Sequence, residues 1–245
     1  MSSSADISTT SNGQDVAAVH DRLRMAILYG ELEAGVSVPQ GQLATEFDVG
    51  RTPLREALRM LQREGLVISE PNRPVRIATL SADDFEEIYI MRISLETVAA
   101  RITVPTLTSD DCAELEACLA KMDHYEKTGD DVGWRTPHRA FHHRLIAGSG
   151  VRVSNMIDEL ADHSERYRLR FGGPGSPMDR RAVHRGILDA AIKGDADLAA
   201  ERLAIHYSQT AALVFSGLDP EHDLARLRQT IRAVAPGAET ALVVS

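Results

Sequence analysis

The chain has 245 residues, a formal net charge of −9 at pH 7 and a hydrophobic content of 43%. This length predicts one or two domains with buried cores, and the acidic balance excludes a protein that binds nucleic acid over its whole surface. No apolar run approaches the roughly 18 residues of a membrane span, and the polar start lacks a secretory signal. We therefore expect a cytoplasmic protein that makes no membrane contact, with Cys112 and Cys118 as reduced thiols.

The amino-terminal part carries helical patterns followed by two β-rich runs. Residues 1–14 are polar and are expected to form a disordered tail. The elements predicted after it are helices over 16–30, 40–47 and 51–65 and strands over 66–69 and 75–78. Three helices followed by a two-stranded hairpin are typical of a winged helix-turn-helix, which we assign to residues 15–79.

From Ser81 onward the strand signals end and helical periodicity continues. Acidic residues after Ser81 and Thr108 favour helix starts there, because carboxylates stabilise the positive end of the helix dipole. Thr136 is expected to cap a further helix, with Pro137 in its first position. The predicted helices run from Ser81 to Ile102, from Thr108 to Lys127, from Thr136 onward, and over about 151–171, 177–193, 195–216 and 220–233. Residues 80–236 are therefore predicted to form an all-helical bundle of six or seven helices, and the fold class is mainly α.

The third predicted helix carries an arginine ridge. Between residues 51 and 76 the charge is locally positive, with six arginines against three glutamates. Four of these arginines recur at every fourth position: Arg51, Arg55, Arg59 and Arg63. The opposite side of the helix is apolar: Leu54, Leu58 and Leu61.

Arginine can donate two hydrogen bonds to guanine or pair with phosphates when a recognition helix enters the major groove. The ridge therefore predicts a DNA-binding surface, with Thr52 beside it. Arg73 would reach the DNA backbone or minor groove from the hairpin tip. The alternative is a solvated helix face with ion pairs such as that of Arg59 with Glu56.

The segments GELEAG, QLATEFDVGRTPLREALRMLQREGLV and PNRPVRIA resemble, in this order, the DNA-binding domain of GntR-superfamily transcription regulators. The resemblance covers nearly all of residues 16–78 and implies that the domain binds operator DNA. It places Arg51, Thr52 and Arg55 at DNA-contacting positions. Gly50 stands where the family commonly has serine, which leaves its backbone N–H for a phosphate, and Pro74 stands where the wing commonly has glycine.

Four of the nine histidines form a pattern in the helical region. His138 and His142 are four residues apart and share a helix face. His184 and His206 each lie 11 residues from residue 195 in the turn KGDAD, so they lie at the same height in an antiparallel helix pair. Imidazoles on facing bundle helices can bind Zn, Ni, Cu or Fe, so the four predict a metal site. The alternative for each is a surface or hydrogen-bonded core histidine, and His143 is expected to be exposed.

The segments SADDFEEIYIMRISLETVAARI, AFHHRLIAGSG and VHRGILDAAIKGDADLAAERLAIH resemble the FCD ligand-binding domain of the FadR subfamily of GntR regulators. Many members hold a metal through Asp-x-x-Phe-His and one histidine on each of two later helices. Phe141-His142, His184 and His206 match this order, while His138 stands at the aspartate position. The resemblance implies a divalent metal, Zn or Ni first, held either by four imidazoles or by three without His138. An all-imidazole site keeps the full metal charge and attracts an anionic ligand.

The resemblance also implies a small carboxylate effector at positions that the metal leaves open. Arg92 in MRISLE stands where the family commonly has arginine, and it can pair with the carboxylate. The alternative for Arg92 is an ion pair with Glu96. Arg166, Arg168 and Arg170 are further candidates for the effector pocket.

Together these features predict a homodimeric DNA-binding transcription regulator, a repressor and not an enzyme. Two winged domains would bind the half-sites of a palindromic operator, and the helical domain would dimerise and bind the effector. Effector binding would change operator affinity. Two alternatives stand beside this prediction. One is a metal sensor in which the metal is the signal. The other is a metalloenzyme in which Glu96, Asp158 or Glu201 supplies the acid/base group.

Overall fold

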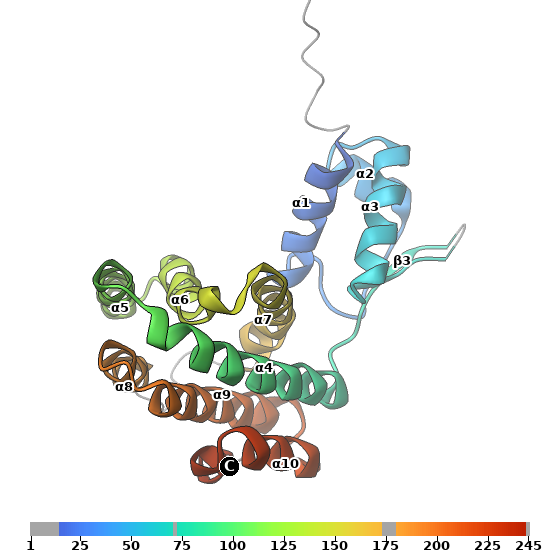
Figure 1. Cartoon of the computed structure of the whole chain (residues 1–245). Helices are drawn as coiled ribbons and strands as arrows, with labels where there is room; N and C mark the ends of the chain where they lie inside the picture. The colour runs from blue at the N-terminus through green and yellow to red at the C-terminus, as the bar shows by residue number, and fades with distance from the viewer. Residues whose placement is uncertain (1–14, 71–72, 173–179, 244–245) are drawn as a thin grey trace, which may run out of the picture. The chain divides into compact units, whose positions relative to one another are not determined.

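The structure is a computed structural model of the chain (Figure 1). It describes residues 15–70, 73–172 and 180–243. The tail predicted over 1–14 lies outside these residues, as do 71–72 at the predicted hairpin tip and 177–179 at the start of a predicted helix. The chain divides into two compact units, Met1–Leu80 and Ser81–Ser245.

The described residues of the first unit form three helices and a small antiparallel sheet. The elements are α1 (Val16–Leu28), β1 (Ser37–Val38), α2 (Gln40–Glu46), α3 (Arg51–Arg63), β2 (Val67–Ile68) and β3 (Val75–Ile77). The sheet order is β1-β3-β2, so the sheet has a third strand beyond the predicted hairpin. This strand lies between the first two predicted helices, where no element was predicted, and it pairs Ser37 with Arg76 and Val38 with Val75. Two residues are too few for a periodic signal, and they pair with β3, a strand far along the chain.

Two tight turns set the direction of the third helix. Asp48 adopts φ 49°, in the left-handed region, between α2 and α3. Asparagine and aspartate tolerate this conformation better than bulkier residues do. After α3, Gly65 adopts φ 74°, and the Leu66 N–H donates to the Leu61 carbonyl at 2.9 Å. This glycine-dependent cap ends the helix and leads the chain directly into β2.

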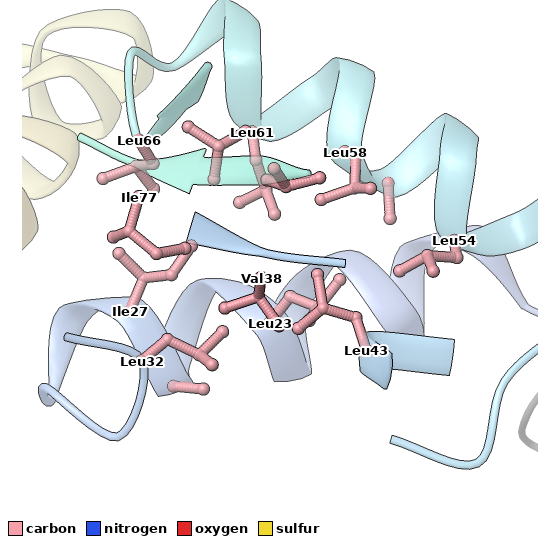
Figure 2. Packing of buried hydrophobic residues seen from close by; sticks show 14 of the residues in the cluster. Leu23, Ile27, Leu32, Val38, Leu43, Leu54, Leu58, Leu61, Leu66 and Ile77 are labelled. Atoms are coloured by element: carbon pink, nitrogen blue, oxygen red, sulfur yellow. The ribbon is translucent and has the colours of Figure 1, made fainter. Parts of the chain in front are cut away.

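The core of the first unit lies between the helices and the sheet, as Figure 2 shows. Apolar residues on α1 recur at helical spacing and face the leucines of α3. The labelled members of this cluster are Leu23, Ile27, Leu32, Val38, Leu43, Leu54, Leu58, Leu61, Leu66 and Ile77. Because these leucines occupy one side of α3, its arginines are left on the opposite, exposed side.

The described residues of the second unit form seven α-helices and three short 3-10 turns. The helices are α4 (Ala82–Thr103), α5 (Ser109–Thr128), α6 (Asp131–Ile146), α7 (Val151–Phe171), α8 (Arg180–Ile192), α9 (Ala196–Leu218) and α10 (Ala225–Val234). The 3-10 turns are η1 (Val104–Thr106), η2 (Ala147–Ser149) and η3 (Pro236–Ala241). Helices α4 and α9 lie side by side (Figure 1), and α4 also packs against α6, α7 and α10. No helix in the described ranges is long and apolar enough to cross a membrane.

Helix α6 begins earlier than predicted. Its N-cap is Asp130, whose carboxylate accepts a hydrogen bond from the Gly133 N–H at 2.8 Å. Gly129, with φ 70°, ends α5 immediately before this cap. The residues between Asp130 and Thr136 are therefore helical, and Thr136 is not a cap. Pro137 therefore lies inside the helix, where it cannot donate to the Gly133 carbonyl. The prediction was wrong because the residues GDDVGW look like a loop but supply a cap.

Candidate metal centre and nucleic-acid interface

Helix α3 presents the predicted DNA-contacting residues on its solvent side. Gly50 is the N-cap, and because it has no side chain it leaves the first N–H groups of the helix without a side-chain cap. Arg51, Thr52, Arg55 and Arg59 are all exposed. The amino-terminal end of the helix thus combines free backbone N–H groups with guanidinium groups, and both attract phosphate.

The arginines predicted to contact DNA differ in whether they form ion pairs within the chain. Arg59 donates to Glu56 at 2.7 Å, which is the ion pair expected of a solvated helix face. Arg73 is exposed and forms an ion pair with Glu70 at 2.8 Å. The first two arginines of α3 form no ion pair with any described residue. Those two are therefore free to contact another molecule without losing an internal partner.

The four histidines lie together in the second unit. His138 and His142 come from α6, His184 from α8 and His206 from α9. Their ring centroids lie between 4.5 Å, for His138 and His142, and 6.1 Å, for His138 and His206, apart. One nitrogen of each lies within 4.8 Å of the others. In the antiparallel pair α8 and α9, the ring centroids of His184 and His206 lie 4.7 Å apart. The two residues are at equal heights along the helices, as their spacing from the turn predicts.

Burial and crowding keep these imidazoles neutral at pH 7. Burial holds the pKa of His138, His142 and His206 well below the ordinary 6.5, and the neighbouring imidazoles lower it further. Burial also lowers the pKa of His184 to about 4, although its hydrogen bond to the Arg180 carbonyl opposes the shift. Metals bind the neutral imidazole, so no proton competes for these nitrogens near neutral pH.

The donor set fits a divalent ion. His184 Nε2 and His206 Nδ1 are buried and have no hydrogen-bond partner in the described part of the chain. His184 Nδ1 donates to the Arg180 carbonyl at 2.6 Å, so its Nε2 carries the lone pair. The Nε2 atoms of His142 and His138 are 3.1 Å apart. A tetrahedral site with bonds of about 2.0–2.1 Å spaces its nitrogens about 3.3 Å apart, so shifts of about an ångström would bring all four onto one ion.

The comparisons with known proteins agree with both units. Residues 16–77 match the family model described as bacterial regulatory proteins, gntR family, and residues 87–209 match the FCD domain model. The chain belongs to the GntR family. It is therefore a DNA-binding transcriptional regulator with an FCD domain, and the resemblance noted in the sequence is confirmed.

Relatives of this GntR regulator cover most of its length. It is 32% identical over 174 residues to the gluconate operon transcriptional repressor of Bacillus licheniformis, covering 67% of this chain and 69% of the relative. It is 27% identical over 192 residues to the HTH-type transcriptional regulator YdhC of Bacillus subtilis, covering 77% and 86%. The solved structure of E. coli McbR/YncC superposes with a TM-score of 0.71 at 22% identity over 84% of this chain and 98% of that one, which shows the shared fold.

Trp134, which sequence reasoning did not single out, covers the half-buried His138 of this GntR regulator. Their rings stack with centroids 4.2 Å apart and planes 23° apart. Trp134 precedes His138 by four residues, so helical spacing alone could have placed it on the same face. The guanidinium carbons of Arg168 and Arg180 lie 5.7 and 5.4 Å from the indole centroid. Because this is the chain's one tryptophan, its fluorescence would report on events at the histidines.

A second missed residue, Tyr207, links α4 to the histidines. Arg92 donates from Nε to Glu96 at 2.8 Å and from a terminal nitrogen to Ser164 at 2.8 Å. The Tyr207 hydroxyl donates to the second oxygen of Glu96 and lies 3.0 Å from His142 Nδ1. All five side chains are buried or nearly so. Tyr207 directly follows a predicted ligand, and consecutive helical residues point about 100° apart, so spacing gave no reason to choose it.

The four arginines predicted to line an effector pocket separate into two pairs. Arg92 forms the ion pair with Glu96 that was the alternative interpretation of this residue. Arg168 donates to Glu165 at 2.7 Å. The positive charges of Arg92 and Arg168 both lower the pKa of His206, so both act electrostatically on the histidine group.

The other pair lies differently. Arg166 is buried, and burial lowers its pKa while Tyr167 and Asp84 oppose the shift. Arg170 is exposed, and its guanidinium carbon lies 6.0 Å from the Phe171 ring centroid. Neither is among the groups that shift the pKa of the four histidines.

The side chains considered as acid/base groups are engaged elsewhere or lie outside the histidine group. Glu96 is taken by its buried partners. Asp158 lies 3.2 Å from Nδ1 of His143, which is exposed as predicted. Among the described residues, none of Glu96, Asp158 and Glu201 belongs to the candidate ligand group.

Proposed function

We propose that this GntR regulator is a homodimeric repressor whose affinity for operator DNA is set by a small carboxylate metabolite. The metabolite would bind at or beside a divalent metal, Zn or Ni, held by His138, His142, His184 and His206. The observation that carries the proposal is the gathering of these four buried or half-buried imidazoles, each offering a nitrogen within 4.8 Å of the others. In this assignment residues 15–79 bind DNA, and residues 80–236 bind the effector and dimerise.

The DNA contacts are assigned to the amino-terminal half of α3. Arg51 and Arg55 would donate to base edges or phosphates, with Thr52 between them and the Gly50 N–H on a phosphate. Arg59 would add a phosphate contact by exchanging its partner Glu56, since an exposed ion pair contributes little to stability. Arg73 would contact the backbone or the minor groove from the wing.

The charge of the site favours an anionic effector. Neutral imidazoles leave a bound divalent ion with its full positive charge, and two guanidinium groups add to the local field. Arg92 and Arg168 would add positive potential that attracts a carboxylate while they stay paired with Glu96 and Glu165, and Arg166 and Arg170 are candidates for its outer contacts. A dicarboxylate or hydroxy acid fits this field better than a neutral sugar.

An apolar stripe on α4 supports dimerisation. Met91, Val98 and Ile102 are 43%, 50% and 50% exposed, and they recur with the half-buried Leu95 at heptad-like spacing. Exposed apolar rows of this kind mark protein–protein contacts. Self-association along α4 would bury the row in both copies and give the two-fold symmetry that a palindromic operator requires.

The four-imidazole set also favours one alternative, a metal sensor. Four nitrogens fill a tetrahedral ion, which leaves no position for a carboxylate. If His138 does not bind the ion, or if the ion takes six ligands as Ni does, coordination positions on the ion stay open for a carboxylate. The two functions therefore differ in whether operator affinity follows the metal alone.

One experiment separates these possibilities. Native mass spectrometry with elemental analysis of the purified chain reports the oligomer, the metal and any retained metabolite. Fluorescence anisotropy with operator DNA then follows affinity after chelation, after Zn or Ni is restored, and with each of a panel of carboxylic acids. A carboxylate effect that needs the metal supports the proposal. A response to metal without any organic ligand supports the sensor, and protein without metal under all loading conditions refutes both.

A further inference from the structure

We infer that Glu96 and Tyr207 are positioning residues for the metal site. Through one chain of hydrogen bonds they orient His142 so that its lone pair lies on Nε2. The same chain brings the negative charge of Glu96 near the four imidazoles, which are themselves uncharged. The inference rests on the proposed metal function, and it assigns a role to two buried side chains that do not themselves belong to the ligand group.

The direction of each hydrogen bond follows from the atoms present. In its ion pair with Arg92, Glu96 is a carboxylate and accepts only, so the single hydrogen of the Tyr207 hydroxyl goes to it. The Tyr207 oxygen is then the acceptor for His142 Nδ1, which lies 3.0 Å away and must carry its proton. His142 Nε2 is left with the lone pair, on the side where His138 Nε2 lies at 3.1 Å. A metal-binding histidine needs this tautomer and ring orientation, which its other nitrogen fixes.

The two oxygens of Glu96 have separate tasks. One accepts from Arg92 at 2.8 Å, and the other accepts from Tyr207. Glu96 is 1% exposed, and a buried carboxylate without a partner would be strongly destabilising. Arg92 offsets that cost through its ion pair with Glu96, and its guanidinium carbon also lies 4.4 Å from the Tyr207 ring centroid. Burial raises the pKa of Glu96, and the charge of Arg92 and the hydrogen bond from Tyr207 oppose this shift. The ion pair with Arg92 is the geometry of a carboxylate, which polarises the Tyr207 hydroxyl toward His142.

The chain of contacts crosses the bundle. Arg92 and Glu96 are on α4, Tyr207 is on α9 and His142 is on α6. A hydrogen bond in such a network fixes a ring more tightly than packing does, because a ring can still rotate about its bond to Cβ in an apolar environment. Loss of the hydroxyl should therefore loosen the imidazole before it loosens the fold.

The test compares full-length protein with Tyr207→Phe, Glu96→Gln, the double variant and the control Tyr89→Phe. Tyr89 is a second buried tyrosine whose ring centroid lies 6.4 Å from that of Tyr207. Zn affinity is measured by competition with a chelator at fixed pH, and bound Co gives an electronic absorption spectrum that reports ligand geometry. Circular dichroism of the metal-free proteins monitors the fold.

Each single variant should bind Zn about 10–100-fold more weakly and shift the Co absorption bands. The double variant should bind Zn no more weakly than Tyr207→Phe, because Glu96 acts through the hydroxyl. Tyr89→Phe should match the unmodified protein in both measurements.

The outcomes that overturn the inference are distinct from those that overturn the proposed function. Unmodified protein that binds neither Zn nor Co removes the metal site and this inference with it. Normal metal binding by the unmodified protein together with normal binding by Tyr207→Phe removes the inference alone. Fully additive losses in the double variant would make Glu96 a merely structural residue. If Tyr207→Phe fails to fold, Glu96→Gln decides, and unchanged Zn affinity in that variant refutes the role.

Discussion

Replacing Arg51 by alanine should weaken operator binding without unfolding the winged unit. Arg51 is the first residue of α3, is exposed, and forms no ion pair with any described residue, so its loss leaves no internal partner unpaired. The buried side of the helix, with Leu54 and Leu58, is untouched. A lost bidentate base contact costs about 1–3 kcal/mol, or about 5–150-fold in affinity. In a two-fold dimer the loss occurs at both half-sites and amounts to about 2–6 kcal/mol.

The assay is fluorescence anisotropy with an operator selected from a random duplex library, repeated at several salt concentrations. A lost phosphate contact would lower the slope of log affinity against log salt by about 1, whereas a lost base contact would relax preference at one operator position. Arg63→Ala is the matched control, since it removes the same charge from the same helix twelve residues further along, about 18 Å away. Equal losses in Arg51→Ala and Arg63→Ala would mean that net charge matters and position does not. Unchanged affinity in Arg51→Ala would refute the assignment of the recognition helix.

Three further predictions concern the second unit. His184→Ala should lower metal content in elemental analysis while His143→Ala, at an exposed position, should not; full occupancy of His184→Ala would contradict the metal site. Glu86 is fully buried and accepts from Arg226 at 2.9 Å and from the Leu227 N–H of α10, so Glu86→Ala should cost about 1–3 kcal/mol, because it leaves this N–H unpaired, and lower Tm by about 2–12 °C, whereas the exposed Glu87→Ala should change little. Metal-free protein should lose stability as pH falls from 6.5 toward 4, because unfolded histidine binds a proton in this window and folded His184, with a pKa of about 4, does not. This residue alone contributes roughly 3 kcal/mol to that loss, and a urea-unfolding free energy that stays level over the window would refute it.

Some of this could be predicted because it is encoded locally. Helical periodicity located the helices of both units, and the order of motifs identified the family, which the family models confirm. The failures occurred where the signal was short or ambiguous. Strand β1 (Ser37–Val38) has two residues and gains its identity only by pairing with β3. The start of α6 depends on one cap, Asp130, in a segment whose composition resembles a loop.

The sequence by itself determined which side chains share a helix face: the arginines opposite the leucines on α3, His138 with His142, and His184 level with His206 across a turn. Only the tertiary structure decided what those faces meet. The contact of Tyr207 with Glu96 and His142 joins three helices, and residues that far apart in the chain are brought together by helix packing and rotation, which no spacing within one helix encodes. Burial is likewise a property of the packed bundle, and burial is what keeps the four imidazoles neutral, the form that the proposed metal site requires.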